Sequence, residues 1–274
     1  MTSGAEIPGA LRGVPPIPIS PEIFDEEHAA TGRSEVIWRL AADAYGEDYP
    51  TEVRPWGLTT WWVLGRCVSA LRVGPGDVVV DLACGRGGPG LWLSRATGAD
   101  LIGVDWSPVA IEEATERTRA FVPSDRARFL VGDLSASGLP GECADAVVCL
   151  DAIFFAEDRI AALREVKRIL RPAGRYAFTG PETDTPTRPG HVRDWTPLLD
   201  AAGLELESKE EVPRFAEQLS RVYALWLEHL DEIRAEIGET AAERLEDEAQ
   251  TVAPTLETRR SIFITARRGR GLSR

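Results

Sequence analysis

The stretch VVVDLACGRGGPG, residues 78–90, decides the fold of this 274-residue chain. It begins with three β-branched valines and is apolar up to Asp81, which is typical of a strand buried on both faces. The glycines that follow allow a tight turn and let a ligand approach the backbone without hindrance from a Cβ atom. Gly85, Gly87 and Gly90 satisfy the pattern GxGxxG, although the same glycines could serve only close packing of a helix on the strand. The segment therefore predicts a strand, a turn and a helix start, with a nucleotide-like ligand as one reading of the turn.

Strands and helices alternate on both sides of this segment. Helices are predicted at 34–45, 59–71, 91–96, 107–121 and 160–170, and further strands at 101–104, 129–131, 146–150 and 175–179. Strands that are apolar on both faces and separated by helices indicate a parallel sheet covered on two sides. The predicted fold class is α/β.

The last third of the chain departs from this alternation. A helix is predicted at 195–202 and strands at 204–212 and 260–266. Between these strands, apolar residues at helical spacing over 215–237 predict one long helix. Thr240-Ala-Ala-Glu243 has the pattern of a capping box, so a second helix is expected to begin there.

Composition and charge restrict the partners. The formal net charge is −13, and a field of that sign repels nucleic acid; the arginines within 259–270 are explained equally well by a solvated tail. The four cysteines form no CxxC pair, so neither a zinc site nor a disulfide framework is predicted. We find no run of about 18 apolar residues and no signal-peptide pattern. The predictions are a cytoplasmic protein with no metal and no nucleic-acid or membrane partner, with a homodimer left open.

Three acids at the ends of successive strands distinguish between cofactors. Asp81 precedes the glycines, where it would repel a pyrophosphate but suit the sulfonium and ammonium of S-adenosylmethionine. Asp105 ends the next strand, where an acid accepts hydrogen bonds from ribose hydroxyls. Asp133 ends the third strand and could accept from an adenine amino group, or cap a helix instead. All three lie at one edge of a parallel sheet, so S-adenosylmethionine is favoured over a dinucleotide.

These residues resemble the motifs of the class I S-adenosylmethionine-dependent methyltransferases. Residues 81–87 are similar to the first motif, 104–108 to the second-strand motif and 132–134 to the adenine-contacting segment. Residues 168–174 are similar to the helix exit before the fifth strand, with Ala173 where glycine is usual. The match covers about residues 70–180.

The resemblance implies a Rossmann-like seven-stranded sheet whose last strand is antiparallel, with an N-terminal helical lid and an inserted helical cap. We expect an N-terminal arm and lid helices at 1–70, the cofactor-binding core at 71–213 and 255–270, and the cap at 214–254. The resemblance also implies a set of cofactor-binding residues: Asp81, Ala83, Gly85, Gly87, Asp105, Trp106, Asp133, Leu134 and Leu150.

Aromatic residues indicate where the methyl acceptor binds. Many tryptophans fall in the N-terminal helices and the predicted cap, although aromatic residues at helical spacing are usually core. The N-terminal ones resemble the lid of methyltransferases that act on quinones, sterols and natural products. An enclosed aromatic pocket suits an apolar or aromatic small molecule. The predicted substrate-binding residues are Tyr49, Trp56, Phe154 and Trp226.

The predicted catalytic residues are His191, Asp151 and His229. Methyl transfer needs mainly alignment and water exclusion, and a general base helps only when the acceptor is a hydroxyl or an acidic carbon. Some relatives use a histidine after the fourth strand, but residues 151–155 contain none. His191 follows the fifth strand and could equally be a solvated loop residue, and His229 could be a core residue. His28 falls in the predicted arm, outside the predicted site.

The sequence thus predicts an S-adenosylmethionine-dependent methyltransferase acting on O, N or C of a small natural-product-like molecule. Two alternatives stay open at this point. The fold could be used for non-methyl chemistry, such as a pericyclic or elimination step. It could also serve an NAD(P)-dependent oxidoreductase, against which Asp81 argues.

Overall fold

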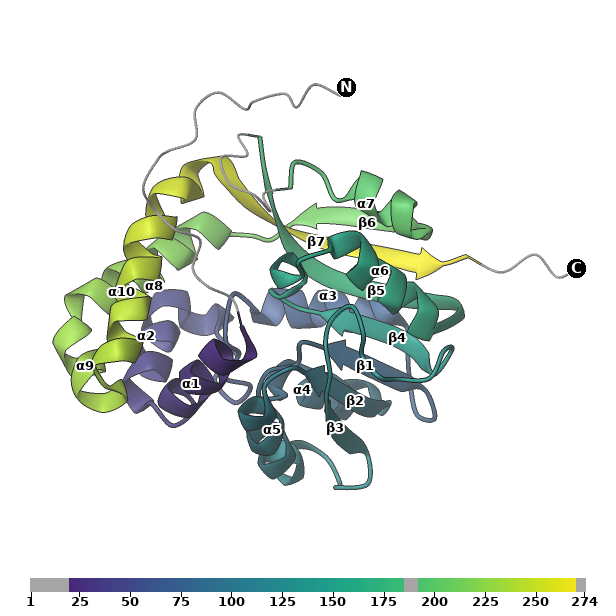
Figure 1. Cartoon of the computed structure of the whole chain (residues 1–274), viewed down its shortest axis with the longest axis horizontal. Coiled ribbons are helices and arrows are strands. Elements are labelled where there is room, and N and C mark those ends of the chain that lie inside the picture. Colours follow the sequence, from purple (N-terminus) through teal and green to yellow (C-terminus); the bar gives the residue numbers. More distant parts are fainter. Residues whose placement is uncertain (1–19, 185–191, 270–274) are drawn as a thin grey trace, which may run out of the picture.

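A single mixed sheet organises the computed structural model, which describes residues 20–184 and 192–269 (Figure 1). Within these ranges the strands are β1 Val78–Leu82, β2 Asp100–Asp105, β3 Ala127–Val131, β4 Ala144–Cys149, β5 Leu170–Thr183, β6 Leu204–Glu211 and β7 Arg259–Arg268. Their order is β3-β2-β1-β4-β5-β7-β6. β7 pairs antiparallel with both β5 and β6, whereas β1 to β5 pair in parallel. The predicted α/β class and the antiparallel last strand are confirmed.

The helices follow the predicted alternation as far as β6. They are α1 Pro21–Thr31, α2 Glu35–Tyr45, α3 Trp61–Leu71, α4 Gly88–Thr97, α5 Pro108–Phe121, α6 Arg159–Ile169, α7 Thr196–Ala202, α8 Phe215–Glu228, α9 Leu230–Ile237 and α10 Glu239–Val252. Short 3₁₀ turns occupy Gly46–Asp48, Ile153–Phe155 and Ala253–Thr258.

Local capping explains why the helices begin where they do. The Ser107 hydroxyl accepts a hydrogen bond from Ala110 N at 3.1 Å, and Pro108 takes the first helical position of α5. α4 begins differently, because its N-cap Gly87 has φ +72°, a conformation that other residues adopt only under strain. The glycine turn therefore leads directly from β1 into α4, as the sequence predicted.

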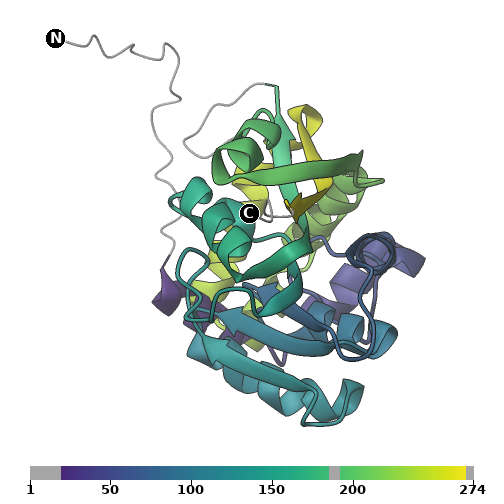
Figure 2. The same ribbon diagram turned by 90° about the vertical axis from the view of Figure 1, so that its right-hand side faces the viewer.

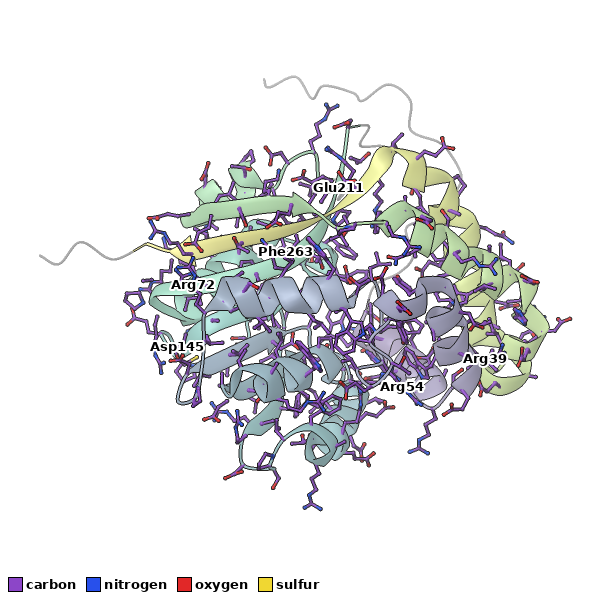
Figure 3. All side chains as sticks on the ribbon, turned by 180° about the vertical axis from the view of Figure 1, so that it is seen from behind. Arg39, Arg54, Arg72, Asp145, Glu211 and Phe263 are labelled. Carbon is purple, nitrogen blue, oxygen red and sulfur yellow. The ribbon has the colours of Figure 1, made fainter. Side chains whose placement is uncertain are left out.

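Both faces of the sheet are covered, which buries its apolar strands. Val79 and Phe263 belong to a core that α2, α3 and α8 cover, whereas Val80 and Phe178 face a second core under α6 and α7. Figure 3 shows α3 lying across the first face beside Phe263, and Figure 2 shows helices on either side of the sheet.

The helices α1, α2 and α8 to α10 gather at one end of the sheet, on the left in Figure 1. α8 and α9 pack on α2, and α10 packs on α8 and contacts α1. The predicted cap at 214–254 and lid at 1–70 thus meet each other here, and the division of the chain into these units stays a prediction.

Three predicted elements were wrong in detail. Residues 21–31 form α1 instead of a loose arm, because the Ser20 hydroxyl accepts from Ile23 N at 3.4 Å and Pro21 starts the helix. The long helix over 215–237 is broken at His229, whose backbone leaves the helical conformation. α10 begins after Gly238 at φ +87°, so Thr240 lies inside its first turn and forms no capping box.

Candidate functional site

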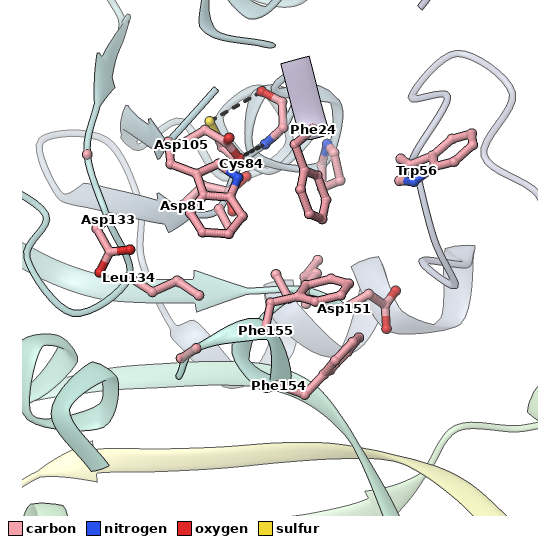
Figure 4. Close-up of a pocket in the computed structure, with 18 of the residues that line it drawn as sticks. Phe24, Trp56, Asp81, Cys84, Asp105, Asp133, Leu134, Asp151, Phe154 and Phe155 are labelled. Atoms are coloured by element: carbon pink, nitrogen blue, oxygen red, sulfur yellow. Dashed lines mark hydrogen bonds between the residues drawn. The ribbon is translucent and has the colours of Figure 1, made fainter. Parts of the chain in front are cut away.

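The carboxyl ends of the parallel strands open into one cavity of about 1380 Å³ (Figure 4). Asp81, Asp105 and Asp133 lie at one end of the view, and Trp56 lies at the other. Between them lie Asp151, Phe24, Phe154 and Phe155. The acids and the aromatic residues that the sequence predicted for two different ligands therefore share one continuous space.

The glycines of the turn divide into two groups. Gly85, at φ +50°, faces the cavity, and a Cβ there would meet only the His28 ring, 3.6 Å away. A Cβ on Gly87 would instead press on Ala114 and Phe129 at 3.0 Å, and one on Gly90 would lie 2.6 Å from Asp81 Oδ2. Gly87 does not line the cavity. The close-packing interpretation therefore holds for Gly87 and Gly90, whereas Gly85 leaves space for a ligand at the cavity wall, and its role in binding stays a prediction.

Two buried carboxyl groups define the floor of the cavity. Asp81 is 3% exposed, and burial together with the nearby Asp105 raises the pKa of its carboxyl to about 8. Burial also raises the pKa of Asp105, opposed by the N–H groups of Gly85 at 2.8 Å and Ser107 at 2.9 Å. A cationic ligand would favour the ionised forms that burial disfavours. These two carboxylates, as hydrogen-bond acceptors of negative charge, thus fit the sulfonium, ammonium and ribose hydroxyls of S-adenosylmethionine.

The remaining predicted cofactor residues line the same end. Ala83, Trp106, Leu134 and Leu150 are all at the cavity wall. Asp133 also lines it, and its carboxylate accepts a hydrogen bond from Ser135 N at 2.7 Å. Of the nine predicted cofactor residues, Gly87 alone stands behind the wall.

An aromatic cluster closes the cavity from the side of α1. The Phe24 ring lies 5.4 Å from both Trp106 and Phe155, measured between ring centroids, and Phe155 is 4.5 Å from Phe154. Phe24 and His28 line the cavity, and sequence reasoning missed both. The signal that could have found them is Ser20-Pro21, the same helix-start pair as Ser107-Pro108.

The predicted acceptor residues separate into lining and supporting ones. Trp56 and Phe154 line the cavity, whereas Tyr49 and Trp226 do not. Trp226 is buried and stacks on Trp56 at 6.2 Å with an interplanar angle of 18°. Tyr49 is buried against Tyr45. The structure therefore places these two residues behind the wall.

Only one of the predicted bases reaches the cavity among the described residues. Asp151 lines it, adopts φ +53°, and accepts hydrogen bonds from Leu58 N at 2.7 Å and from the Thr179 hydroxyl at 2.9 Å. Burial raises the pKa of its carboxyl. His229 lies at the junction of α8 and α9, outside the cavity wall, with Nδ1 3.2 Å from Glu232. His191 lies outside the described residues.

His28, which the sequence interpretation set aside, is buried beside Gly85. Burial and the neighbouring Arg86 lower the pKa of its imidazole to about 4. It is therefore a neutral ring at physiological pH, and it contributes shape and polarity to the cavity instead of charge.

Comparison with known proteins agrees with this geometry. The methyltransferase domain family matches residues 79–174. Aklanonic acid methyltransferase DauC from Streptomyces sp. (strain C5) is 31% identical over 164 residues, which cover 58% of this chain and 71% of DauC. Methyltransferase GfsG from Streptomyces halstedii is 30% identical over 154 residues, and the chain spans only 55% of GfsG's length. The solved structure of the [4+2]-cyclase SpnF is 19% identical with a TM-score of 0.72, covering 94% of this chain and 99% of that one.

The fold and the site define a class I S-adenosylmethionine-dependent methyltransferase. The chain belongs to this family, in its small-molecule branch, and S-adenosylmethionine is its cofactor. This result favours the predicted cofactor over the nicotinamide alternative. In residues 20–184 and 192–269 we find no helix long and apolar enough to cross a membrane, and no group of three or more side chains suited to hold a metal ion.

Proposed function

We propose that the protein transfers a methyl group from S-adenosylmethionine to O, N or C of a small, apolar or aromatic, natural-product-like molecule. The observation that carries the proposal is the single cavity, with buried acids at one end and an aromatic wall at the other. The names of DauC and GfsG, which describe methyltransferases from Streptomyces, support this branch.

The cofactor, when bound, supplies a methyl group already activated on a sulfonium. The residues of this chain then have to align the acceptor and exclude water, which together account for much of the acceleration of a displacement reaction. Asp81 and Asp105 are suited to hold the cationic and ribose parts. Phe24 and Phe155 cover the cavity from the side of α1 and keep water out.

A hydroxyl or an acidic carbon must also lose a proton. Asp151 is the base that we propose, because it lines the cavity and its carboxyl is shifted toward the pKa range of a general base by burial. The hydrogen bonds from Leu58 N and Thr179 hold this carboxylate in place. An amine acceptor would not need this group.

The test is a turnover assay with a panel of aromatic polyketide-like acceptors. We expect S-adenosylhomocysteine and a product heavier by one methylene unit to form in equal amounts, as measured by mass spectrometry. If none of the tested acceptors is methylated, the true acceptor stays unknown. Binding of S-adenosylhomocysteine and of NAD is therefore measured in parallel. Tight binding of NAD without binding of S-adenosylhomocysteine would overturn the proposal.

A second candidate function is a non-methyl reaction, such as a cyclisation, with the cofactor site retained. Two observations favour it: the fold is similar to that of the [4+2]-cyclase over 94% of the chain, and residues 151–155 contain no histidine. Substrate consumption with no release of S-adenosylhomocysteine would support this candidate over methyl transfer.

A further inference from the structure

A buried arginine lines the cavity without a full set of partners. The Arg86 side chain, on the glycine turn, is only 4% exposed. Its Nη2 is buried and has no hydrogen-bond partner among the residues that the structure describes. Its Nη1 lies 3.8 Å from Glu113 Oε2, which is beyond hydrogen-bond distance. Because burying an uncompensated charge is strongly unfavourable, such a group is unusual unless a ligand completes its hydrogen bonds.

The neighbours of Arg86 add positive charge instead of removing it. Arg54 and Arg117 line the same part of the cavity. Arg117 donates to the backbone carbonyls of Arg86 at 2.9 Å and Val53 at 2.6 Å, so its charge is not neutralised by these contacts. Burial, and the repulsion from these two arginines, lower the pKa of the Arg86 guanidinium to about 10, so it remains a cation at neutral pH.

The acids close to this group leave the hydrogen-bonding edge of Arg86 free. Arg54 lies 3.7 Å from Glu35, and Arg86 lies 3.8 Å from Glu113. Glu27 is also buried within electrostatic range of Arg86, and its pKa of about 7 leaves it only partly ionised at neutral pH. None of these carboxylates accepts a hydrogen bond from Arg86 Nη2. The nearby imidazole of His28 is neutral at this pH and adds no charge.

The orientation of Arg86 is fixed before any ligand arrives. Its guanidinium lies 4.3 Å from the centre of the Trp38 ring, a cation–π contact, and Trp38 packs on Trp56 at 5.8 Å. A planar guanidinium that is held on one face by an aromatic ring presents its edge to a carboxylate, for which its geometry is suited.

We propose that Arg86, with Arg54 and Arg117 beside it, forms a carboxylate-binding site in the cavity. The identity of the ligand rests on the proposed function. Under that function, the carboxylate belongs either to the amino-acid end of the cofactor or to an acidic acceptor. The chain of contacts from Arg86 through Trp38 to Trp56 favours the acceptor, whose class is then an apolar or aromatic carboxylic acid.

The test compares each carboxylate with a neutral analogue of the same shape. Calorimetric titrations at pH 7.5 use a naphthoate and its amide, and S-adenosylhomocysteine and its decarboxylated form. The proteins are the wild type, Arg86→Met and Arg86→Lys. Arg39→Met is the matched control, because Arg39 pairs with Glu232 on the outer helices, away from the cavity wall (Figure 3).

We expect Arg86→Met to lower the binding affinity of one of the two carboxylates about ten- to a hundredfold, while the affinity of its neutral analogue is unchanged. Arg86→Lys should recover part of this loss, and Arg39→Met should show none. A loss confined to the naphthoate assigns the site to an acidic acceptor, and a loss confined to S-adenosylhomocysteine assigns it to the cofactor. Retained binding of the neutral analogues shows that the variant is folded.

Equal effects on a carboxylate and its neutral analogue, or no effect on either carboxylate, would overturn the carboxylate site. Failure of the proposed function looks different. In that case the wild type itself does not bind S-adenosylhomocysteine, and the comparison of naphthoate with its amide still decides whether Arg86 binds carboxylates.

Discussion

The two ends of the cavity are built in different ways. At the cofactor end, Asp81, Asp105 and the turn after β3 stand at the carboxyl ends of adjacent parallel strands, so the sheet itself brings them together. At the acceptor end, the wall combines α1, the loop at 54–59 and the segment after β4, which are far apart in the sequence. The difference teaches that strand register brings together the residues proposed to bind the cofactor, whereas packing between distant segments shapes the proposed acceptor end.

The largest effect is expected where the two ends meet, at Asp151. The Asp151→Asn variant keeps an oxygen that accepts from Leu58 N–H, and its amide can donate to the Thr179 hydroxyl once that hydroxyl rotates, so the loop should stay in place. If Asp151 is the base, kcat for a hydroxyl or acidic-carbon acceptor falls roughly 10²- to 10⁴-fold, with unchanged affinity for S-adenosylhomocysteine. Steady-state kinetics with the acceptor check this. An unchanged kcat would leave Asp151 with a structural role only.

The next effect concerns the cofactor end without ligand. The pKa of Asp81 rises from 3.8 to about 8 on folding, so the folded state holds a proton that the unfolded state has lost over this range. Stability of the wild type therefore falls as pH rises from about 4 to 8. Asp81→Asn has no such titration. Relative to the wild type, its melting temperature should therefore rise by several degrees between pH 5 and pH 8. Thermal scans of both proteins at pH 5 and pH 8 test this, and parallel curves would contradict it.

Sequence reasoning was most accurate where a single local signal determines the structure. Strand β1 and the Ser107-Pro108 helix start were found within one residue, and α4 begins three residues before its predicted start, because a glycine turn and a capping pair act locally. The break at His229 could not be found in this way, since apolar residues keep their helical spacing across it. Phe24 was missed for a related reason: its role depends on contact with Trp106 and Phe155, which lie far along the chain.

A smaller effect is expected at the acceptor end. Phe24→Ala removes the ring that lies between Trp106 and Phe155 and opens the cavity to water. We expect KM for an apolar acceptor to rise about tenfold, because a half-buried aromatic side chain contributes about 1–2 kcal/mol. Affinity for S-adenosylhomocysteine should change less than KM. If the cofactor affinity instead falls more than the acceptor's, α1 covers the cofactor and not the acceptor.

The smallest effect is expected at His229, which stands outside the cavity. His229→Ala removes one contact with Glu232 at the surface, so the free energy of unfolding should change by no more than about 0.5 kcal/mol. Turnover should be unchanged in the same assay. A marked loss of kcat with normal stability would return this residue to the catalytic candidates.

The central claim is that acids at successive strand ends select a cationic adenosyl cofactor. Calorimetric titration of S-adenosylmethionine into the wild type and Asp81→Asn at pH 8 tests it most directly. We predict binding to the wild type and a loss of about ten- to a hundredfold in the variant, since a charge-assisted contact is removed. Equal affinity in both proteins would contradict the account.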